Sequence, residues 1–332
     1  MYKLLSRKRI IQVAGAGLLV LALTACGEEE AATDSTNTND TEEASSGDTE
    51  ETGTRTLTDA MGNEVEIPEN PERVLASYLE DYLVALDITP VAQWSVNDNA
   101  SIQEYLQDDL EGVPTIPHDL PFEAVQEVQP DLIIMDSASM VEGGKYEQYN
   151  KIAPTFVIGT EINNDWREEL RLVGEVFGKE EKAEEVLADY ETKAEEAKAE
   201  IESAVGTPSA AAIWLVGGNF FLVSETLSSG TVMYDDLGMT VPEVVKEISA
   251  SGESNWNAIS LEKLVELDAE HLFLINSDTA SGSSALSDAL WESIPAVKAG
   301  NVYEFSPEES WLYTGAIANS QIIDYVKESL VK

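Results

Sequence analysis

One long helical segment divides the chain. Residues 165–205 are rich in Ala, Glu, Lys and Leu and contain no proline, so they predict one long helix, or two helices that break near Gly178. On both sides of this segment short β-rich runs alternate with helical runs, as in "RVLAS", "YLEDYLVALD" and "PVAQW". Such alternation predicts an α/β fold with mainly parallel sheets. Roughly 280 residues follow the N-terminal region, more than one hydrophobic core usually serves, so we expect two lobes.

The second half of the chain repeats the first weakly. "PFEAVQEVQPDLIIMD" and "SLEKLVELDAEHLFLIN" each indicate a short helix led by a glutamate and then a buried strand, and one inserted residue aligns Glu123 with Glu262. We therefore predict an N-terminal lobe over 55–163, an interlobe helix over 164–206 and a C-terminal lobe over 207–332. The two lobes would have like topology and face each other across a cleft.

The N-terminus is typical of an exported protein. Four basic residues precede the apolar run Ile10–Ala25. This run is shorter than the roughly 20 apolar residues of a membrane-spanning helix, so residues 1–25 are interpreted as a cleaved signal peptide. The string Leu23-Thr24-Ala25-Cys26 resembles the bacterial lipobox, in which the signal is cut just before a cysteine that carries a diacylglyceryl group. That resemblance implies a lipid on Cys26, the single cysteine of the chain.

Residues 26–54 are predicted to be a solvated tether. Residues 27–54 carry ten acidic side chains and no basic one, with few apolar residues, so this segment cannot bury enough surface to fold. The whole chain has 63 acidic and 19 basic residues and a formal net charge of −44. Nucleic acid and an anionic membrane surface are therefore not expected as partners.

Aromatic residues dominate the positions that follow the predicted strands. In open parallel sheets ligands bind beyond the carboxyl ends of the strands, so these positions are the candidates for ligand contact. The predicted contacts are Tyr78, Trp94, Ser137, Trp214, Phe220, Trp311 and Tyr313. Rings with a few hydroxyl groups suit a bulky amphipathic ligand better than a bare ion or a sugar phosphate. Trp166 and Trp291 are assigned to packing.

Neither a metal site nor catalysis is expected. The two histidines, His118 and His271, fall in different lobes without a pattern of further ligands, so a site for free zinc or manganese is not predicted. No nucleophile elbow, P-loop or dinucleotide fingerprint occurs, so we expect no cofactor and no enzyme activity. An extracytoplasmic enzyme and a receptor that signals without transport remain the rival classes.

Several strings together resemble a known family. From about Leu57 the chain reads, in order, "LTDAMGNEVEIPENPERV", "VQPDLII", "YNKIAPTFVI", "ISLEKLVELDAEHLFLI" and "IPAVKAGNVYEF". In this order and spacing it resembles the class III substrate-binding lipoproteins of ABC importers, and most the iron-hydroxamate branch of Gram-positive bacteria. The resemblance implies two α/β lobes joined by a long rigid helix, which close only slightly on a ligand. It also implies that Glu123 and Glu262 dock onto arginines of the permease, although a glutamate in a first helical turn also complements the helix dipole.

Charge narrows the expected ligand. Ferric catecholates are strongly anionic, and relatives that bind them resemble one another in using several Arg or Lys in the cleft. The strand-end positions of this chain hold no basic residue, which fits a neutral or mildly positive iron(III)-hydroxamate. The chain departs from the hydroxamate pattern at "WLVGGNFF", where many relatives place an arginine, and Arg167, Arg171 or Lys145 could reach the cleft instead.

The prediction is a monomeric, lipid-anchored binding protein on the extracytoplasmic face of the cell membrane. It would capture an iron(III)-siderophore, an already chelated metal that needs no side-chain ligands, and deliver it to ABC permease subunits with a cytoplasmic ATPase. A ferric citrate-type or catecholate chelate, haem and cobalamin remain alternative ligands.

Overall fold

The computed structural model describes residues 53–96, 101–160, 165–250, 254–279 and 284–331. They belong to one compact unit, Glu51–Lys332. The predicted signal peptide, Cys26 and all but the last two residues of the predicted tether lie outside the described residues. Among the helices that are described, none is long and apolar enough to cross a membrane.

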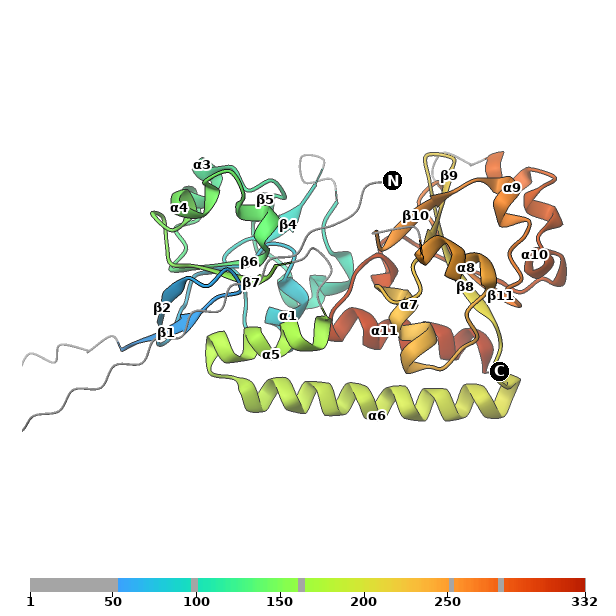
Figure 1. Ribbon diagram of the computed structural model, residues 1–332, viewed down its shortest axis with the longest axis horizontal. Helices are drawn as coiled ribbons and strands as arrows, with labels where there is room; N and C mark the ends of the chain where they lie inside the picture. The colour runs from blue at the N-terminus through green and yellow to red at the C-terminus, as the bar shows by residue number, and fades with distance from the viewer. Residues whose placement is uncertain (1–52, 97–100, 161–164, 251–253, 280–283, 332) are drawn as a thin grey trace, which may run out of the picture. The chain divides into compact units, whose positions relative to one another are not determined.

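The N-terminal lobe is built on short strands and short helices (Figure 1). Its described strands are β1 (Thr54–Thr58), β2 (Glu64–Pro68), β3 (Val74–Leu75), β4 (Gln93–Ser95), β5 (Thr115–Pro117), β6 (Leu132–Ser137) and β7 (Thr155–Gly159). A parallel sheet has the order β3-β6-β7, β4 pairs with β5 in parallel, and β1 pairs with β2 antiparallel. The helical segments are α1 (Glu80–Ala85), η1 (Glu104–Leu106), α2 (Gln107–Leu110), α3 (Phe122–Glu127), η2 (Ala138–Val141) and α4 (Lys145–Tyr149).

The apolar strand β6 faces two hydrophobic cores. Leu132 and Ile134 lie in the larger core, whereas Ile133 and Met135 lie in a second core of the N-terminal lobe. Side chains alternate between the two faces of a strand, so a strand covered on both faces needs an unbroken apolar run. The run "LIIM" supplies these apolar side chains. Packing on both faces fixes β6, the middle strand of the sheet, and with it the position of its carboxyl end.

The C-terminal lobe has a five-stranded sheet of order β10-β9-β8-β11-β12 in its described part. β8, β11 and β12 are parallel, and β9 and β10 are antiparallel. The strands are β8 (Ala210–Val216), β9 (Asn219–Val223), β10 (Trp256–Ile259), β11 (His271–Asn276) and β12 (Val302–Phe305). The helical segments are α7 (Ser229–Thr231), η3 (Val232–Asp236), α8 (Glu243–Ser249), α9 (Leu261–Leu264), η4 (Ser284–Ser287), η5 (Trp291–Ser293), α10 (Pro295–Ala299), η6 (Ser310–Leu312) and α11 (Ala316–Leu330). Together with the parallel strands of the N-terminal lobe, this sheet confirms the α/β fold.

Two helices, not one, join the lobes. α5 (Trp166–Phe177) ends at Gly178, whose φ of +62° closes the helix in the left-handed region, and α6 (Glu180–Val205) then runs back beneath it (Figure 1). α6 packs against α5 and, further along, against α11 of the C-terminal lobe. Its buried side chains recur every three or four residues along one face, at Ala183, Leu187, Tyr190, Ala194, Ala197 and Ile201. The single helix α6 thus contacts both α5 and α11 of the C-terminal lobe.

A second contact between the lobes, which we call the interlobe seam, joins α1 to the start of α11. The buried carboxylate of Asp81 accepts backbone hydrogen bonds from Ile317 at 3.0 Å and Ala318 at 2.8 Å. It also accepts one from the hydroxyl of Tyr105 at 3.1 Å. Helix α11 has no side-chain cap of its own at Gly315, so a residue of the other lobe caps it.

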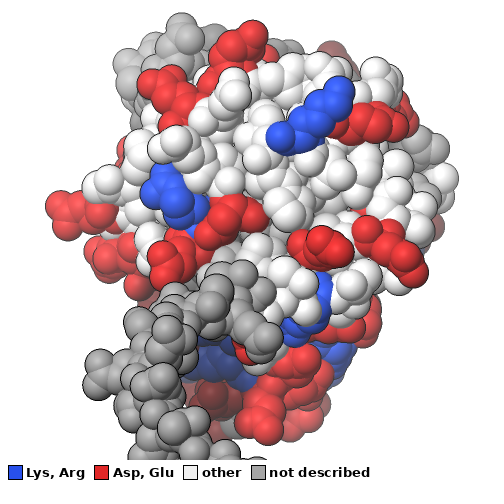
Figure 2. All heavy atoms as spheres, turned by 90° about the vertical axis from the view of Figure 1, so that its left-hand side faces the viewer, with Lys and Arg blue, Asp and Glu red and all other residues white. Residues whose placement is uncertain are grey.

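Acidic side chains dominate the described surface at the β1–β2 end of the molecule. In Figure 2 this face shows many more Asp and Glu than Lys and Arg side chains. The excess agrees with the composition, because the chain has 63 acidic and 19 basic residues.

Candidate functional site

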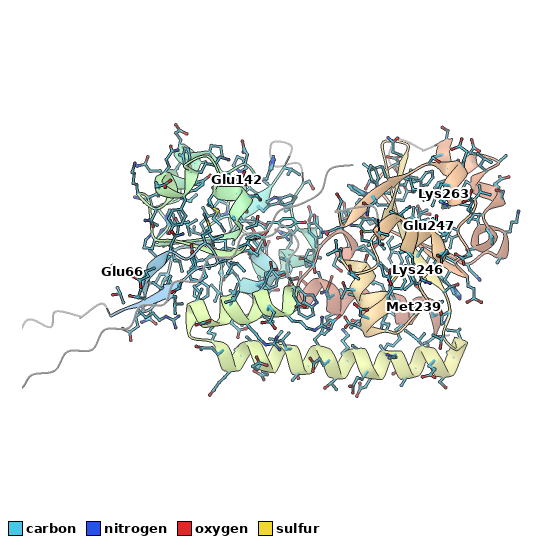
Figure 3. The ribbon with its side chains drawn as sticks, in the orientation of Figure 1. Glu66, Glu142, Met239, Lys246, Glu247 and Lys263 are labelled. Carbon is cyan, nitrogen blue, oxygen red and sulfur yellow. The ribbon has the colours of Figure 1, made fainter. Side chains whose placement is uncertain are left out.

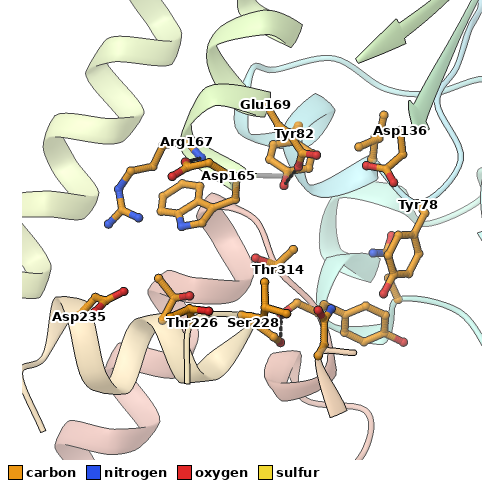
Figure 4. A pocket seen from close by; sticks show the side chains of 17 residues that line it. Tyr78, Tyr82, Asp136, Asp165, Arg167, Glu169, Thr226, Ser228, Asp235 and Thr314 are labelled. Atoms are coloured by element: carbon orange, nitrogen blue, oxygen red, sulfur yellow. Dashed lines mark hydrogen bonds between the residues drawn. The ribbon is translucent and has the colours of Figure 1, made fainter. Parts of the chain in front are cut away.

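A pocket with a cavity of about 180 Å³ lies between the lobes (Figure 4). Its walls come from the N-terminal lobe, from α5 and from the C-terminal lobe. The polar and aromatic lining residues are Tyr78, Tyr82, Gln103, Asp136, Asp165, Trp166, Arg167, Glu169, Thr226, Ser228, Thr231, Asp235, Asn255, Tyr313 and Thr314. Small-molecule sites usually have about 300–1,000 Å³, so this cavity encloses only a part of a bulky ligand.

Four rings form an aromatic cluster at this pocket: Tyr78, Trp94, Tyr105 and Tyr313. The ring of Tyr78 lies 5.4 Å from that of Trp94 and 6.3 Å from that of Tyr313, which comes from the other lobe. Tyr313 lies 6.4 Å from Trp94 and 5.1 Å from Tyr105. The structure therefore brings together three of the rings selected from the sequence. Tyr105, which belongs to η1 and follows no strand, was missed because nothing in its local pattern marks it.

Tyr78 has unusual geometry for the residue that links β3 to α1. Its φ is +71°, in the left-handed region that residues other than glycine rarely adopt. Its side chain is 40% exposed, although most large apolar side chains of the described residues are buried. Such backbone conformations concentrate at ligand sites, where the surrounding structure holds a side chain in a particular direction. At this position the backbone aims the ring at the pocket.

Two predicted contacts lie in the core of the C-terminal lobe instead. Trp311 is 0% exposed and packs 4.9 Å from Phe305 and 5.2 Å from Phe273, because the η6 turn directs its ring inward. Phe220 is buried on the core face of β9 and stacks on Trp291 at 5.4 Å. Neither ring offers a surface to a ligand, and Trp291 packs as expected.

Ser137 and Trp214 also lie outside the lining of the cavity. Ser137 is buried, and its hydroxyl is 2.9 Å from that of Ser139. Trp214 is half-buried in a second group of rings, 5.4 Å from Phe221 and 6.2 Å from Trp256, and its Nε1 donates to Ser277 at 2.8 Å. Trp256, the first residue of β10, directly follows Asn255, which lines the cavity.

Carboxyl groups give the pocket its charge. Asp136 at the end of β6 is hydrogen-bonded to Glu169 of α5, and Tyr82 donates to Glu169 Oε2 at 2.5 Å. Burial, together with the negative charge of Glu169, raises the pKa of Asp136 to about 8, so the pair shares one proton near neutral pH. Asp165 and Asp235 line the same cavity (Figure 4).

A single basic side chain, Arg167, is among the residues that line the cavity. It forms an ion pair with Asp236 at 2.7 Å, and its guanidinium lies 4.5 Å from the centre of the Trp166 ring. Arg171 instead pairs with Glu168 and Glu184 away from the cavity, and Lys145 does not line it. The positive charge of Arg167 is therefore balanced by Asp236.

Sequence reasoning missed the acidic part of the pocket and the role of Trp166. Asp136 directly precedes Ser137 at a strand end, so its position was a signal that could have been used. Glu169 and Trp166 lie on α5, which was interpreted only as a connection between the lobes. Trp166 lines the cavity in addition to packing against Tyr190 at 4.8 Å.

The described residues contain no group of three or more His, Cys, Asp or Glu side chains that could hold a metal ion. His271 contacts the hydroxyl of Tyr303 at 3.2 Å, in the C-terminal lobe. His118 follows β5 in the N-terminal lobe and does not line the cavity.

Glu123 and Glu262 occupy the same place in the two lobes. Each is the second residue of its helix, α3 or α9, and each is exposed. Both helices lie on the side of the molecule away from α6 (Figure 1). Lys263 does not neutralise its neighbour Glu262, because it pairs with Glu247 at 2.8 Å and Glu266 at 2.7 Å (Figure 3).

Comparisons with known proteins agree with this architecture. The model of a family described as periplasmic binding protein matches residues 79–309. The iron(3+)-hydroxamate-binding protein FhuD of Bacillus subtilis is 28% identical, over 95% of this chain and 95% of its own length. The probable siderophore-binding lipoprotein YfiY of the same organism is 27% identical, over 95% of this chain and 96% of its own. A solved structure of the FhuD fold family, a periplasmic binding protein component of a ferrichrome ABC transporter from Bacillus subtilis, has a TM-score of 0.71 at 26% identity. It matches over 83% of this chain and 100% of that one.

Proposed function

Since the chain belongs to the periplasmic binding protein family, we propose that it captures an iron(III)-siderophore, of the hydroxamate type, and delivers it to an ABC permease. The ligand would lie between the lobes, with its bulky body against the aromatic cluster. No bond is made or broken in this function.

The pocket's charge is the observation that carries the hydroxamate assignment. A ferric catecholate is strongly anionic, and its desolvation needs paired cations. The cavity instead has Asp136, Asp165, Glu169 and Asp235 in its walls, and the charge of Arg167 is matched by Asp236. A neutral or positive chelate suits these walls. The similarity to a protein named for iron(3+)-hydroxamate binding supports the same ligand class.

Direct binding to the ligand tests this assignment. Fluorescence of the six tryptophans of the mature chain is titrated with ferrioxamine B, ferrichrome, a ferric catecholate, ferric citrate and cobalamin. The expected result is saturable quenching at one equivalent by a hydroxamate complex and none by the catecholate. The iron-free hydroxamate is the control for unspecific quenching. Quenching by the catecholate alone would show that the ligand class is wrong.

Delivery to the permease is assigned to the two exposed glutamates, Glu123 and Glu262. Their matched positions at the outer ends of the two lobes suit contact with two copies of a basic surface. Replacing both with alanine should leave siderophore binding intact and abolish uptake by cells that depend on this protein. The exposed Glu127→Ala variant of the same helix α3 is the matched control and should support normal uptake. If the double variant loses binding instead, these residues belong to the ligand site.

The membrane anchor is part of the same proposal. The sequence pattern around Cys26 and the similarity to a protein named as a lipoprotein support a lipid on this residue at the extracytoplasmic face of the membrane. Labelling of growing cells with a radioactive fatty acid should mark the wild-type protein and not the Cys26→Ser variant. Equal labelling of both would exclude Cys26 as the site.

A further inference from the structure

Three polar atoms in the pocket lack a partner among the described residues. They are Oε1 of Gln103, Oδ1 of Asn255 and Nε1 of Trp166. Gln103 is 3% exposed and Trp166 is 5% exposed, whereas Asn255 is half-buried. Buried polar groups in folded proteins are nearly always hydrogen-bonded, and an unpaired one is destabilising. Two of these three atoms are acceptors, so what the pocket chiefly lacks is a hydrogen-bond donor.

The charge of the pocket points the same way. The pair Asp136–Glu169 retains negative charge even while it shares a proton, and Asp235 adds to it. Asp165 also lines the cavity, but its carboxylate caps α5 by accepting the backbone N–H groups of Arg167 and Glu168. The Arg167–Asp236 ion pair cancels itself. A ligand group that enters this cavity meets a net excess of carboxylates over basic side chains as well as unpaired oxygen atoms, and both favour a cationic hydrogen-bond donor.

The cation that fits is organic rather than metallic. The acidic side chains come from β6, α5 and η3 and do not form a metal-binding group among the described residues. The rings of Tyr78, Tyr82, Trp166 and Tyr313 line the same cavity, and aromatic faces attract ammonium groups. A cavity of about 180 Å³ has room for an alkylammonium arm but not for a whole ferric chelate.

We propose that this pocket binds a protonated primary amine at the end of a flexible arm, so that the ligand is a linear ferric hydroxamate with a cationic end. The inference rests on the proposed function, because the chelate body must lie outside the cavity, against the aromatic cluster. A primary ammonium has three donor hydrogens, enough for the acid pair and for the amide oxygens of Gln103 and Asn255. A quaternary ammonium would leave those oxygens unpaired.

Acetylation of the amine provides a direct test. Ferrioxamine B is a linear trihydroxamate with one terminal primary amine, and N-acetylation removes its charge without altering the iron centre. Both complexes are titrated against the unmodified mature chain by tryptophan fluorescence. We expect the amine form to bind at least about tenfold more tightly, because a charge-assisted hydrogen bond is lost on acetylation. Equal affinity, or binding of ferrichrome but of neither ferrioxamine complex, would overturn the inference and leave the proposed function standing. Binding of no ferric hydroxamate at all would overturn the proposed function itself.

A pair of variants locates the effect. In Asp136→Asn/Glu169→Gln the preference for the amine form should fall to within about twofold, because the acid pair no longer offers a charged acceptor to the ammonium. The control is Asp87→Asn, an equally conservative change at an aspartate whose side chain is 74% exposed and pairs with Lys182. This control should keep the full preference. A double variant that still prefers the amine form by tenfold would place the ammonium elsewhere.

Discussion

The interlobe seam and the pocket are both buried polar contacts between the same two lobes, yet their hydrogen bonding differs. At the seam both oxygens of Asp81 accept backbone N–H groups of α11, at 2.8 and 3.0 Å. At the pocket Gln103 and Trp166 are equally buried, but each has a polar atom without a partner among the described residues. At the seam the Asp81 contact itself is complete without a ligand and joins the lobes, although Glu80 Oε2 of α1 and the side-chain amide of Asn319 of α11 lack partners among the described residues. The unpaired atoms of the pocket differ from these in that their residues line a cavity that a ligand can enter.

The seam also depends on close approach. Gly315 precedes α11 with a φ of +142°, and a Cβ atom at this position would lie 2.3 Å from Asp81 Oδ1. Only glycine allows the carboxylate to reach the N–H groups of the helix. The pocket instead takes its rings from separate elements, such as Tyr82 of α1, Trp166 of α5 and the loop residue Tyr78. Each of the following experiments affects one of these two regions and should spare the other.

The largest effect is expected at the seam. Asp81→Ala removes the acceptor of two backbone N–H groups, which remain buried, so the free energy of unfolding should fall by about 2–4 kcal/mol. Urea unfolding measures the change. Asp87→Asn, at the exposed aspartate of the same region, is the control and should cost no more than about 0.5 kcal/mol, because asparagine also tolerates the positive φ of this position. Equal stability of the two variants would show that the seam does not hold the lobes.

A smaller and different effect is expected at the aromatic cluster. Tyr78→Ala removes a ring that is 40% exposed, so stability should change little. Affinity for the ferric hydroxamate should fall about tenfold, because an aromatic contact contributes about 0.5–1.5 kcal/mol beyond the area that it buries. Met61→Ala, at an apolar side chain that is 47% exposed and outside the pocket, should bind normally. Unchanged binding by Tyr78→Ala would remove this ring from the site.

The two regions also differ in how far they could be predicted from sequence. The strand–helix alternation and the segment 165–205 predicted the α/β fold and the connection between lobes, because periodicity and length are local properties. The strand-end rule selected Tyr78, Trp94 and Tyr313 of the cluster. It could not distinguish Tyr313 from Trp311, two residues away, because the η6 turn decides which ring faces inward.

The acidic part of the pocket and the seam could not be predicted in the same way. Glu169 follows the ordinary pattern of a helix, and it reaches Asp136 only because of the rotation of α5 against the N-terminal lobe. Asp81 and Ile317 are 236 residues apart in sequence, and no local pattern links a carboxylate in one helix to the start of another. Both features depend on how separately formed elements pack.

The smallest expected effect concerns pH, and it separates the two regions by their pKa values. Burial raises the pKa of Asp81 at the seam to about 6 and that of Asp136 at the pocket to about 8, from the ordinary aspartate value of 3.8. Each group holds its proton to a higher pH in the folded chain than in the unfolded one. Its contribution to stability is therefore fully present below about pH 4 and is lost as the pH rises through the folded pKa.

Between pH 6.5 and 8.5 the seam aspartate Asp81 is already ionised. The remaining loss of stability in this range should therefore come from the pair Asp136–Glu169 and from Glu80. Burial raises the pKa of Glu80 to about 8. The melting temperature of the wild type should fall from pH 6.5 to pH 8.5. In Asp136→Asn this fall should be smaller by about 2–4 °C, which corresponds to about 1 kcal/mol for a protein of this size. Glu123→Gln, at an exposed carboxylate, should leave the slope unchanged. If Asp136→Asn keeps the wild-type slope, Asp136 is already ionised at neutral pH, and the pocket then carries more negative charge than the shared proton allows.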